Sequence, residues 1–296
     1  MPATIISGIE TARTIREEIG EEVRRLKQEY NLVPGLVTIL VGDDPASLSY
    51  VAAKNKTAEA LGIHSEQVTL PAATAEVDLL RIIDEANRNP AIHGILVQLP
   101  LPRHINETRV LFTIDPGKDV DGFHPVNVGK MLLGEQCFLP CTPNGILHLL
   151  HRTGIETSGA EVVVIGRSNI VGKPVASLML QKREGGNATV TVCHTRTRDM
   201  GFHTRRADIL IVAAGVARMI KADQIKEGAV IIDVGINRVG QAANGKALLA
   251  GDVDFDDVVG KAGAITPVPG GVGPMTITML MQNTLQAAKQ AAEVDD

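Results

Sequence analysis

Apolar positions in the first half of the chain form two different patterns. Near the start, five of them recur at intervals of three or four within a charged stretch, as on one face of an amphipathic helix; they are Ala12, Ile15, Ile19, Val23 and Leu26. Short continuous apolar runs follow at 36–42 and 94–100, and the segments around 46–61 and 76–89 have helical patterns. Continuous apolar strands that alternate with helices predict parallel α/β structure.

Apolar runs of strand length are more frequent in the second half. A helix is predicted from Thr142 and Pro143, which suit a helix cap and first turn, to Gly154, which suits its end. Four runs with the character of a Rossmann-type sheet follow, at 161–166, 188–193, 207–215 and 228–235. A Gly- and Pro-rich segment, 266–274, then precedes a terminal helix that is predicted from apolar residues at helical spacing.

The length and composition are those of a two-domain enzyme. A chain of 296 residues fits two domains on a prior of about 150 residues each. Hydrophobic residues make up 44% of the chain and charged residues 21%, which is ordinary for a globular enzyme. Because aromatic residues are only 2% and Trp is absent, we expect an aliphatic core.

The distribution of charge and hydropathy narrows the possible partners. The net charge is −5, and Lys and Arg are dispersed instead of forming the basic stripe that nucleic-acid binding requires. No segment approaches the roughly 18 consecutive apolar residues of a membrane span, and MPATIISGIE lacks the features of a signal peptide. We therefore expect neither nucleic acid nor a membrane as partner, and a cytoplasmic location.

The three cysteines do not form a disulfide framework, and we expect reduced thiols. Cys137, Cys141, His148 and His151 supply four potential zinc ligands within fifteen residues. Their spacing, Cys-x3-Cys and then His-x2-His, argues against a structural zinc site. The interpretation we prefer is buried small side chains and histidines on a helix surface, with no metal.

A dinucleotide-binding loop is predicted where the strand 161–166 ends. The glycines Gly166 and Gly172 lie in a turn that leads from this buried strand into a helix, where free amides and the helix dipole can receive a pyrophosphate. The segment is not G-x-G-x-x-G, so a simple tight turn in an α/β protein is the alternative.

The end of the next strand indicates which dinucleotide is bound. An NAD enzyme usually places Asp or Glu there to bind the ribose hydroxyls. This strand instead ends with Cys193, His194, Thr195 and Arg196, and no carboxylate occurs before Asp199. Together with Arg167 in the first loop, these residues can surround a phosphate, which favours NADP over NAD.

The first half carries polar groups near strand and helix ends. Tyr50 and Lys54 are four residues apart and share a helix face, Gln98 closes an apolar run, and Asp119 and Asp121 lie in GKDVDGFHP. Ligands of α/β proteins bind at the carboxyl ends of the strands. Taken singly, each residue also has a plain structural interpretation as a surface lysine, a capping amide or a turn residue.

Seven blocks together resemble the bifunctional methylenetetrahydrofolate dehydrogenase/methenyltetrahydrofolate cyclohydrolase family. In chain order they are VGDDPASLSYVAAKNKTAEALGI, HGILVQLPLP, PGKDVDGFHPVNVGKM, PCTPNGI, VVVIGRSNIVGKPVA, DVGIN and ITPVPGGVGPMTITML. They span nearly the whole chain. Two departures are Thr195, where the family usually has Ser, and the loop 197–206, which matches no family pattern we recognise.

The resemblance implies a two-domain α/β fold, with a catalytic folate-binding domain at 1–141 and 274–296 and a Rossmann-type NADP-binding domain at 142–273. It implies that the last helix returns to the first domain and that the chain forms a homodimer through the second. The implied activity is oxidation of 5,10-methylenetetrahydrofolate with NADP, followed by hydrolysis of the methenyl product to 10-formyltetrahydrofolate. An NADP-dependent dehydrogenase of the shikimate dehydrogenase type is the alternative, although it should lack the PVPGGVGP block.

The resemblance also assigns roles to residues. Lys54 corresponds to the central catalytic group, Tyr50 to its neighbour, Gln98 to the residue that holds and tunes it, and Asp121 to the pterin-binding carboxylate. The implied folate-site residues are Tyr50, Lys54, Val97, Gln98, Leu99, Asp121, Pro269, Gly270 and Gly273. The implied NADP-site residues are Gly166, Arg167, Ser168, Gly172, Thr195, Arg196 and Ile236.

Overall fold

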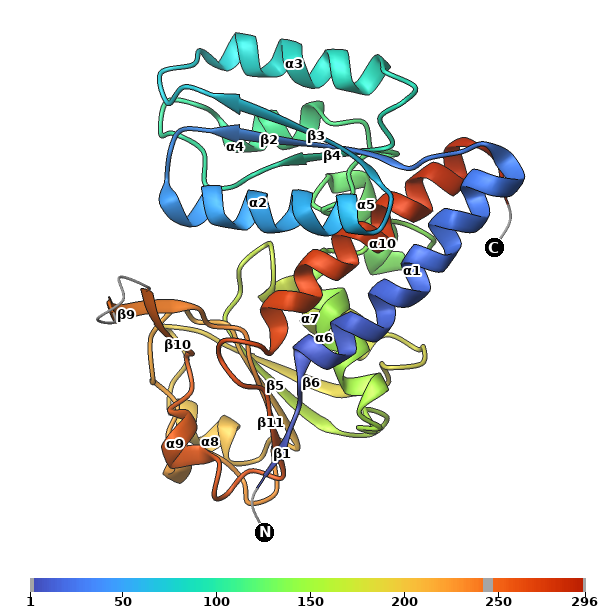
Figure 1. Ribbon diagram of the computed structural model, residues 1–296. Coiled ribbons are helices and arrows are strands. Elements are labelled where there is room, and N and C mark those ends of the chain that lie inside the picture. The colour runs from blue at the N-terminus through green and yellow to red at the C-terminus, as the bar shows by residue number, and fades with distance from the viewer. Residues whose placement is uncertain (1–2, 242–246, 295–296) are drawn as a thin grey trace. The chain divides into compact units, whose positions relative to one another are not determined.

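The computed structural model describes residues 3–241 and 247–294. The chain divides into two compact units, and Figure 1 shows their elements. Unit 1 contains residues 1–13 and 142–276, and unit 2 contains residues 14–141 and 277–296. The fold class is therefore the predicted two-domain α/β architecture.

Unit 2 is built on a three-stranded parallel sheet in the order β3-β2-β4. Its strands are β2 (Gly35–Val41), β3 (His64–Leu70) and β4 (Gly94–Val97). The helices within this part of the chain are α2 (Pro45–Ala60), α3 (Glu76–Arg88), α4 (Glu107–Thr113) and α5 (Pro125–Leu133). In Figure 1, α3 covers one face of the sheet and α2 the other, which explains why β2 is buried along its whole length.

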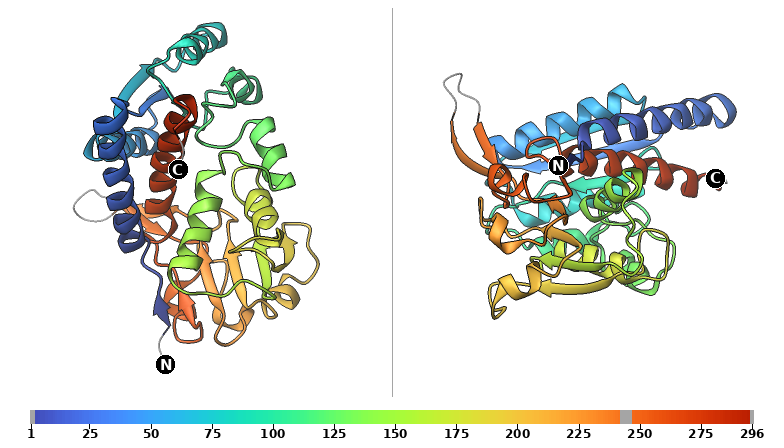
Figure 2. Two further views of the ribbon diagram at one scale, coloured as in Figure 1. Left: turned by 90° about the vertical axis from the view of Figure 1, so that its right-hand side faces the viewer. Right: turned by 90° about the horizontal axis from the view of Figure 1, so that it is seen from below.

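Two long helices complete unit 2. These are α1 (Gly8–Tyr30) and α10 (Val272–Ala291), which lie side by side in both views of Figure 2. Arg16 Nε donates to Thr278 Oγ1 at 2.9 Å, and Lys289 Nζ lies 3.2 Å from Glu22 Oε1. The apolar stripe predicted on α1 is buried, with Leu26 fully inaccessible. The return of the last helix therefore closes the core of unit 2.

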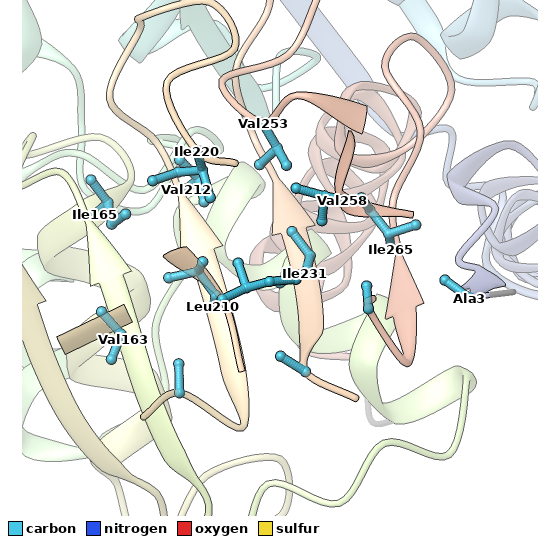
Figure 3. Packing of buried hydrophobic residues seen from close by; sticks show 14 of the residues in the cluster. Ala3, Val163, Ile165, Leu210, Val212, Ile220, Ile231, Val253, Val258 and Ile265 are labelled. Atoms are coloured by element: carbon cyan, nitrogen blue, oxygen red, sulfur yellow. The ribbon is translucent and has the colours of Figure 1, made fainter. Parts of the chain in front are cut away.

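Unit 1 contains a six-stranded parallel sheet in the order β1-β11-β8-β7-β5-β6. Its strands are β1 (Thr4–Ile5), β5 (Glu161–Ile165), β6 (Thr189–Cys193), β7 (Ile209–Val212), β8 (Val230–Asp233) and β11 (Ala264–Ile265). Alternate residues of neighbouring strands point to one face, so that Val163, Leu210 and Ile231 form a continuous layer (Figure 3).

Short helices and a hairpin complete unit 1. The helical segments are α6 (Cys141–Arg152), α7 (Gly172–Leu180), α8 (Met200–Thr204), α9 (Phe255–Val258) and the 3-10 turn Ala222–Gln224. The antiparallel strands β9 (Asn237–Gln241) and β10 (Ala247–Ala250) form the hairpin. Helix α7 packs against β5 and β6, and this packing fixes the loop that connects β5 to α7.

The N-terminal segment lies in a different unit from the one we predicted. Residues 1–13 belong to unit 1, whereas the predicted first domain began at residue 1. The physical reason is strand pairing: β1 extends the large sheet because Thr4 and Ile5 pair in parallel with Ala264 and Ile265. Only two residues long, β1 carries no periodic signal in the sequence.

The order in which successive strands are added to the large sheet reverses at β5. Strand β6 lies on one side of β5, whereas β7, β8 and β11 follow on the other. In such a sheet, ligands bind at the carboxyl ends of the strands on either side of the reversal. These ends are the segments after Ile165 and after Val212. No helix in the described part of the chain is long and apolar enough to cross a membrane.

Candidate active site

Lys54 is a buried basic residue of unit 2. Helix α2 begins at Pro45 after an Asp44 cap, whose carboxylate accepts a hydrogen bond from Ser47 N at 2.8 Å. Three turns later the Lys54 side chain is only 5% exposed. Its ammonium lies 5.0 Å from the centre of the Tyr50 ring, as the spacing of four predicts. A cation at this distance from an aromatic face gains electrostatic stabilisation.

Gln98 holds the Lys54 ammonium in one orientation. Lys54 Nζ donates to Gln98 Oε1 at 3.0 Å. The side-chain amide of Gln98 in turn donates to the Leu99 carbonyl at 2.7 Å, and its backbone N donates to Ile39 O at 2.8 Å. Because its amide group is already committed to Leu99, Gln98 presents an oxygen and not an N–H to the lysine. Val97, the preceding residue, is buried at the end of β4.

Burial and the neighbouring groups act on the pKa of Lys54 in opposite directions. Burial lowers the pKa of Lys54, and the negative charge of Asp121 opposes this shift. Burial raises the pKa of Asp121, whereas Lys54 and a hydrogen bond with Cys141 lower it. Desolvation is the largest contribution for both groups. The site can therefore exchange protons more readily than an exposed lysine could.

The loop that carries Asp121 is held by a second carboxylate. Asp119 accepts hydrogen bonds from Phe123 N at 3.3 Å, His124 N at 2.8 Å and Asn127 Nδ2 at 2.9 Å. Burial raises the pKa of Asp119 to about 6. The residue after Asp121 is Gly122, whose φ of +76° and close approach to the 138–140 backbone leave no room for a Cβ. Asp119 thus supports the loop, while Asp121 lies next to Lys54.

Sequence reasoning missed two residues of this site. Cys141 is 1% exposed and donates to Val120 O at 3.3 Å. Asn283 of α10 donates to Val120 O at 2.8 Å and to Leu139 O at 2.9 Å. The block PCTPNGI contains Cys141 but gave no role for it, and no local pattern marks Asn283. Both residues fix the backbone on which Asp121 lies.

Two of the four possible zinc ligands, His151 and Cys141, make contacts with other residues. His151 Nδ1 lies 3.5 Å from Glu184 Oε1, and Cys141 faces the Val120 carbonyl. All three cysteines are free thiols. Within the described residues, no group of three or more His, Cys, Asp and Glu side chains is placed to hold a metal ion.

A glycine turn follows β5 in unit 1, at the reversal point of the sheet. Gly166 has a φ of +117°, and a Cβ there would collide with the Ala213 carbonyl after β7. A Cβ on Gly172, the first residue of α7, would collide with the Gly166 carbonyl. Ser168 Oγ accepts from Val171 N at 3.1 Å and from Gly172 N at 3.3 Å. The backbone is therefore compact enough for a pyrophosphate to approach it closely.

The loop after β6 begins beside this glycine turn, because Cys193 pairs with Ile165 in the sheet. His194 Nδ1 accepts a hydrogen bond from Arg196 N at 3.1 Å, so the turn is ordered. The side chains of Thr195 and Arg196 are exposed, as are those of Arg167 and Ser168. The nearest carboxylate in this loop, Asp199, accepts from Phe202 N at 3.0 Å and caps α8. The two exposed arginines and the two hydroxyl side chains suit a phosphate on the cofactor ribose better than an unmodified ribose hydroxyl.

The remaining predicted ligand residues of unit 1 lie after β8 and β11. Ile236 is 56% exposed, and a Cβ on Gly273 would lie 3.7 Å from its Cδ1 atom. Gly270 has a φ of +104°, and its carbonyl accepts from Ile9 N at 3.1 Å. The peptide bond before Pro269 is cis. Ile236 and Gly273 are therefore neighbours, which brings one predicted cofactor residue and one predicted folate residue together.

Comparisons with known proteins match both units. The family model for the tetrahydrofolate dehydrogenase/cyclohydrolase catalytic domain covers residues 6–121, and that for its NAD(P)-binding domain covers residues 140–292. The bifunctional protein FolD of Syntrophus aciditrophicus is 65% identical over 292 residues, 99% of each chain.

Solved structures agree with these matches. The bifunctional FolD of Campylobacter jejuni is 47% identical, with a TM-score of 0.91 over 97% of this chain and 99% of its own. The FolD of Trypanosoma brucei, in complex with NADP cofactor and inhibitor, is 40% identical, with a TM-score of 0.93 over 99% of each chain. A shikimate dehydrogenase of Thermus thermophilus is 17% identical with a TM-score of 0.51, covering 86% of this chain and 99% of its own, and shares the fold alone.

Proposed function

Because the chain belongs to the tetrahydrofolate dehydrogenase/cyclohydrolase family, we propose that Lys54, held by Gln98, transfers protons in its cyclohydrolase step. The protein oxidises 5,10-methylenetetrahydrofolate to 5,10-methenyltetrahydrofolate with NADP and hydrolyses the product to 10-formyltetrahydrofolate. The observation that carries the proposed role is the 3.0 Å hydrogen bond from Nζ of the buried Lys54 to Gln98 Oε1.

The oxidation requires positioning more than acid–base catalysis. The carbon that loses hydride is flanked by two nitrogens, and both stabilise the resulting cation. NADP, when bound, supplies the hydride acceptor. The role of the protein in this step is to hold the reacting groups in the correct geometry. In this proposal Asp121 anchors the pterin, and Val97 and Leu99 contribute to the folate site from the end of β4.

The hydrolysis requires proton transfer. Water adds to the methenyl carbon, and protons must then move from oxygen to nitrogen. A neutral Lys54 amine can accept a proton from the attacking water, and its ammonium can return one to the departing nitrogen. Burial lowers the pKa of Lys54, which makes the neutral amine easier to form than in an exposed lysine. Gln98 and Tyr50 keep the amine at one place throughout.

The residues at the carboxyl edge of the large sheet fit NADP. The glycine turn at Gly166 and Gly172 leaves space beside the backbone for the pyrophosphate. In the proposed site, Arg167, Ser168 and Thr195 bind the phosphate on the ribose, with Arg196 at its border. The exposed side chain of Ile236 supplies an apolar surface for the cofactor.

Substitution of Lys54 tests the proposed role. Lys54→Met should lower the cyclohydrolase rate by about a hundredfold or more, because general acid–base catalysis contributes on that order. Lys56→Met, which removes an exposed charge from the same helix, is the matched control and should leave both activities unchanged. Asp121→Ala should impair both activities, because a substrate anchor serves both steps. Near-normal cyclohydrolase turnover in Lys54→Met would disprove the role.

Further proposals concern assembly and location. We propose a homodimer that forms through unit 1, and the position of β6 supports this. It is the last strand of the six-stranded sheet, and Val192 on it is 39% exposed. Edge strands offer unpaired backbone groups for association. The free thiols Cys137, Cys141 and Cys193 are consistent with the reducing conditions of the cytoplasm, where we propose that the enzyme acts without nucleic acid as a partner.

A further inference from the structure

Two buried carboxylates of unit 1 lie outside the roles assigned so far. Asp252 is fully inaccessible and Asp233 is 3% exposed. Each is surrounded by hydrogen-bond donors from loops at the carboxyl edge of the large sheet. Buried charges are costly unless their hydrogen bonds are made. Their positions, one at the end of β8 and one after β10, make them candidates for ordering that edge.

Asp252 anchors the loop after β7. Its Oδ2 atom accepts from Ala214 N at 2.6 Å and from Gly215 N at 2.8 Å. Its Oδ1 atom accepts from Asn237 Nδ2 at 2.8 Å. The loop after β7 adjoins the reversal point of the sheet, where a Cβ on Gly166 would collide with the Ala213 carbonyl. Asp252 thus determines the backbone position on one side of the proposed cofactor site.

Asp233 joins this anchor to the next two loops. Its Oδ1 atom accepts from Asp252 N at 2.9 Å and Gly235 N at 3.0 Å, and its Oδ2 atom accepts from Val253 N at 2.9 Å. Its own backbone N donates to Thr266 Oγ1 at 2.8 Å. Thr266 is fully buried and begins the segment that contains the predicted folate residues Pro269, Gly270 and Gly273. A chain of direct contacts therefore runs from Gly215 to Thr266.

The backbone packs closely against the two carboxylates. A Cβ on Gly251 would overlap Asp233 Oδ2, and a Cβ on Gly235 would overlap Asp252 Oδ1. The two carboxylates are also close enough for the charge of Asp252 to add to burial in raising the pKa of Asp233, to about 6. The apolar layer in Figure 3 is formed by aliphatic side chains, and one of its residues, Val253, also donates its backbone N–H to Asp233. Both carboxylates accept hydrogen bonds from the loops at the carboxyl edge of the sheet.

We propose that Asp252 and Asp233 are positioning residues, which align the proposed cofactor loop at Ala214 and Gly215 with the segment that follows Thr266 for hydride transfer. This inference rests on the proposed cofactor site. Hydride transfer depends on the distance and orientation of donor and acceptor, and small displacements have large effects on its rate. The hydrolysis does not involve the cofactor, and its proton-transfer residue, Lys54, lies in unit 2. A change at Asp252, which holds the cofactor loop directly, should therefore affect the dehydrogenase more than the hydrolysis.

The first test is Asp252→Asn in the full-length enzyme. An amide places N–H groups opposite Ala214 N or Asn237 Nδ2, so at least one hydrogen bond is lost. The KM and the dissociation constant for NADP should rise by about tenfold or more, as expected when charge-assisted hydrogen bonds are removed. Cyclohydrolase kcat should stay within about twofold. The matched control is Asp256→Asn, which makes the same charge change at an exposed position and should alter neither activity.

The second test is Thr266→Val, which removes the acceptor of the Asp233 N–H without changing the shape of the side chain. Dehydrogenase kcat should fall by about tenfold while the dissociation constant for NADP stays within about twofold. Thr266→Val also tests the positioning role if Asp252→Asn fails to fold.

Unchanged dehydrogenase constants in both variants would overturn the positioning role. A parallel fall of both activities together with the melting temperature would overturn it as well, because it would indicate a loss of stability only. If the unmodified protein does not bind NADP, the proposed function itself fails and this inference fails with it.

Discussion

Arg167 is the residue on which the proposed cofactor selectivity chiefly depends. It is exposed in the loop after β5, beside the loop that carries Thr195 and Arg196. A guanidinium that binds a phosphate forms charge-assisted hydrogen bonds, and a cofactor without this phosphate gains nothing from them. The family relation supports NADP, and no carboxylate that could bind a ribose hydroxyl occurs between Cys193 and Asp199.

Arg167→Ala should therefore weaken NADP binding by about ten- to hundredfold, because each charge-assisted hydrogen bond contributes about 1.5 to 3 kcal/mol. Initial rates with NADP and with NAD measure the effect, and the Michaelis constant for NAD should change far less. Lys182→Ala removes an exposed charge from the same unit and serves as control. Equal use of the two cofactors by the unmodified enzyme would show that the phosphate site is placed wrongly.

At the scale of elements, the loop between α4 and α5 shows how a buried carboxylate can order a functional segment. Asp119 accepts three hydrogen bonds from donors that follow it in the chain, and these bonds shape the turn that presents Asp121. Asp119 itself is 2% exposed, and burial raises its pKa to about 6 from an ordinary value of 3.8. The folded protein therefore binds the Asp119 proton more tightly than the unfolded chain does.

The stability contributed by Asp119 is fully present below pH 3.8 and is lost as the pH rises through about 6. We expect the difference in unfolding free energy between the unmodified protein and Asp119→Asn to fall by about 1 kcal/mol from roughly pH 5 to roughly pH 7. Urea unfolding at several pH values measures this difference. Asp84→Asn, an exposed substitution in α3, should show no such trend. A pH-independent difference for Asp119→Asn would refute the expectation.

At the scale of the whole molecule, the exposed edge of the large sheet is where we expect subunits to associate. The solution mass should be about twice the 31.4 kDa of the chain, as measured by light scattering during size-exclusion chromatography. Val192→Asp introduces a charge on β6 and should shift the mass toward that of the monomer. Val77→Asp places the same charge on α3, where Val77 is 70% exposed, and should leave the mass unchanged. A monomeric unmodified protein would contradict the proposed dimer.

Local patterns in the sequence were sufficient for most of the secondary structure. Predicted apolar runs correspond to β2, β4, β5, β6, β7 and β8, and the stripe of three- and four-residue intervals corresponds to α1. A strand that is buried on both faces requires continuous apolar residues, and a helix that is buried on one face requires apolar residues with a period near 3.6. Both patterns can be recognised in the sequence. Strand β3 escaped prediction because it lies at the edge of its sheet and has polar, largely exposed residues.

The sequence by itself also determined the face that Tyr50 and Lys54 share, because helical geometry brings residues four apart together. Only the tertiary structure decided which groups surround them and which unit the first residues join. Asn283 and Val120 are 163 residues apart, and Asp252 and Ala214 are 38 apart. Such hydrogen bonds join segments that are distant in the sequence, and no local pattern in either segment indicates the partner. Their partners exist only once the sheets and helices have packed, and for this reason the supporting residues of both sites were invisible in the sequence.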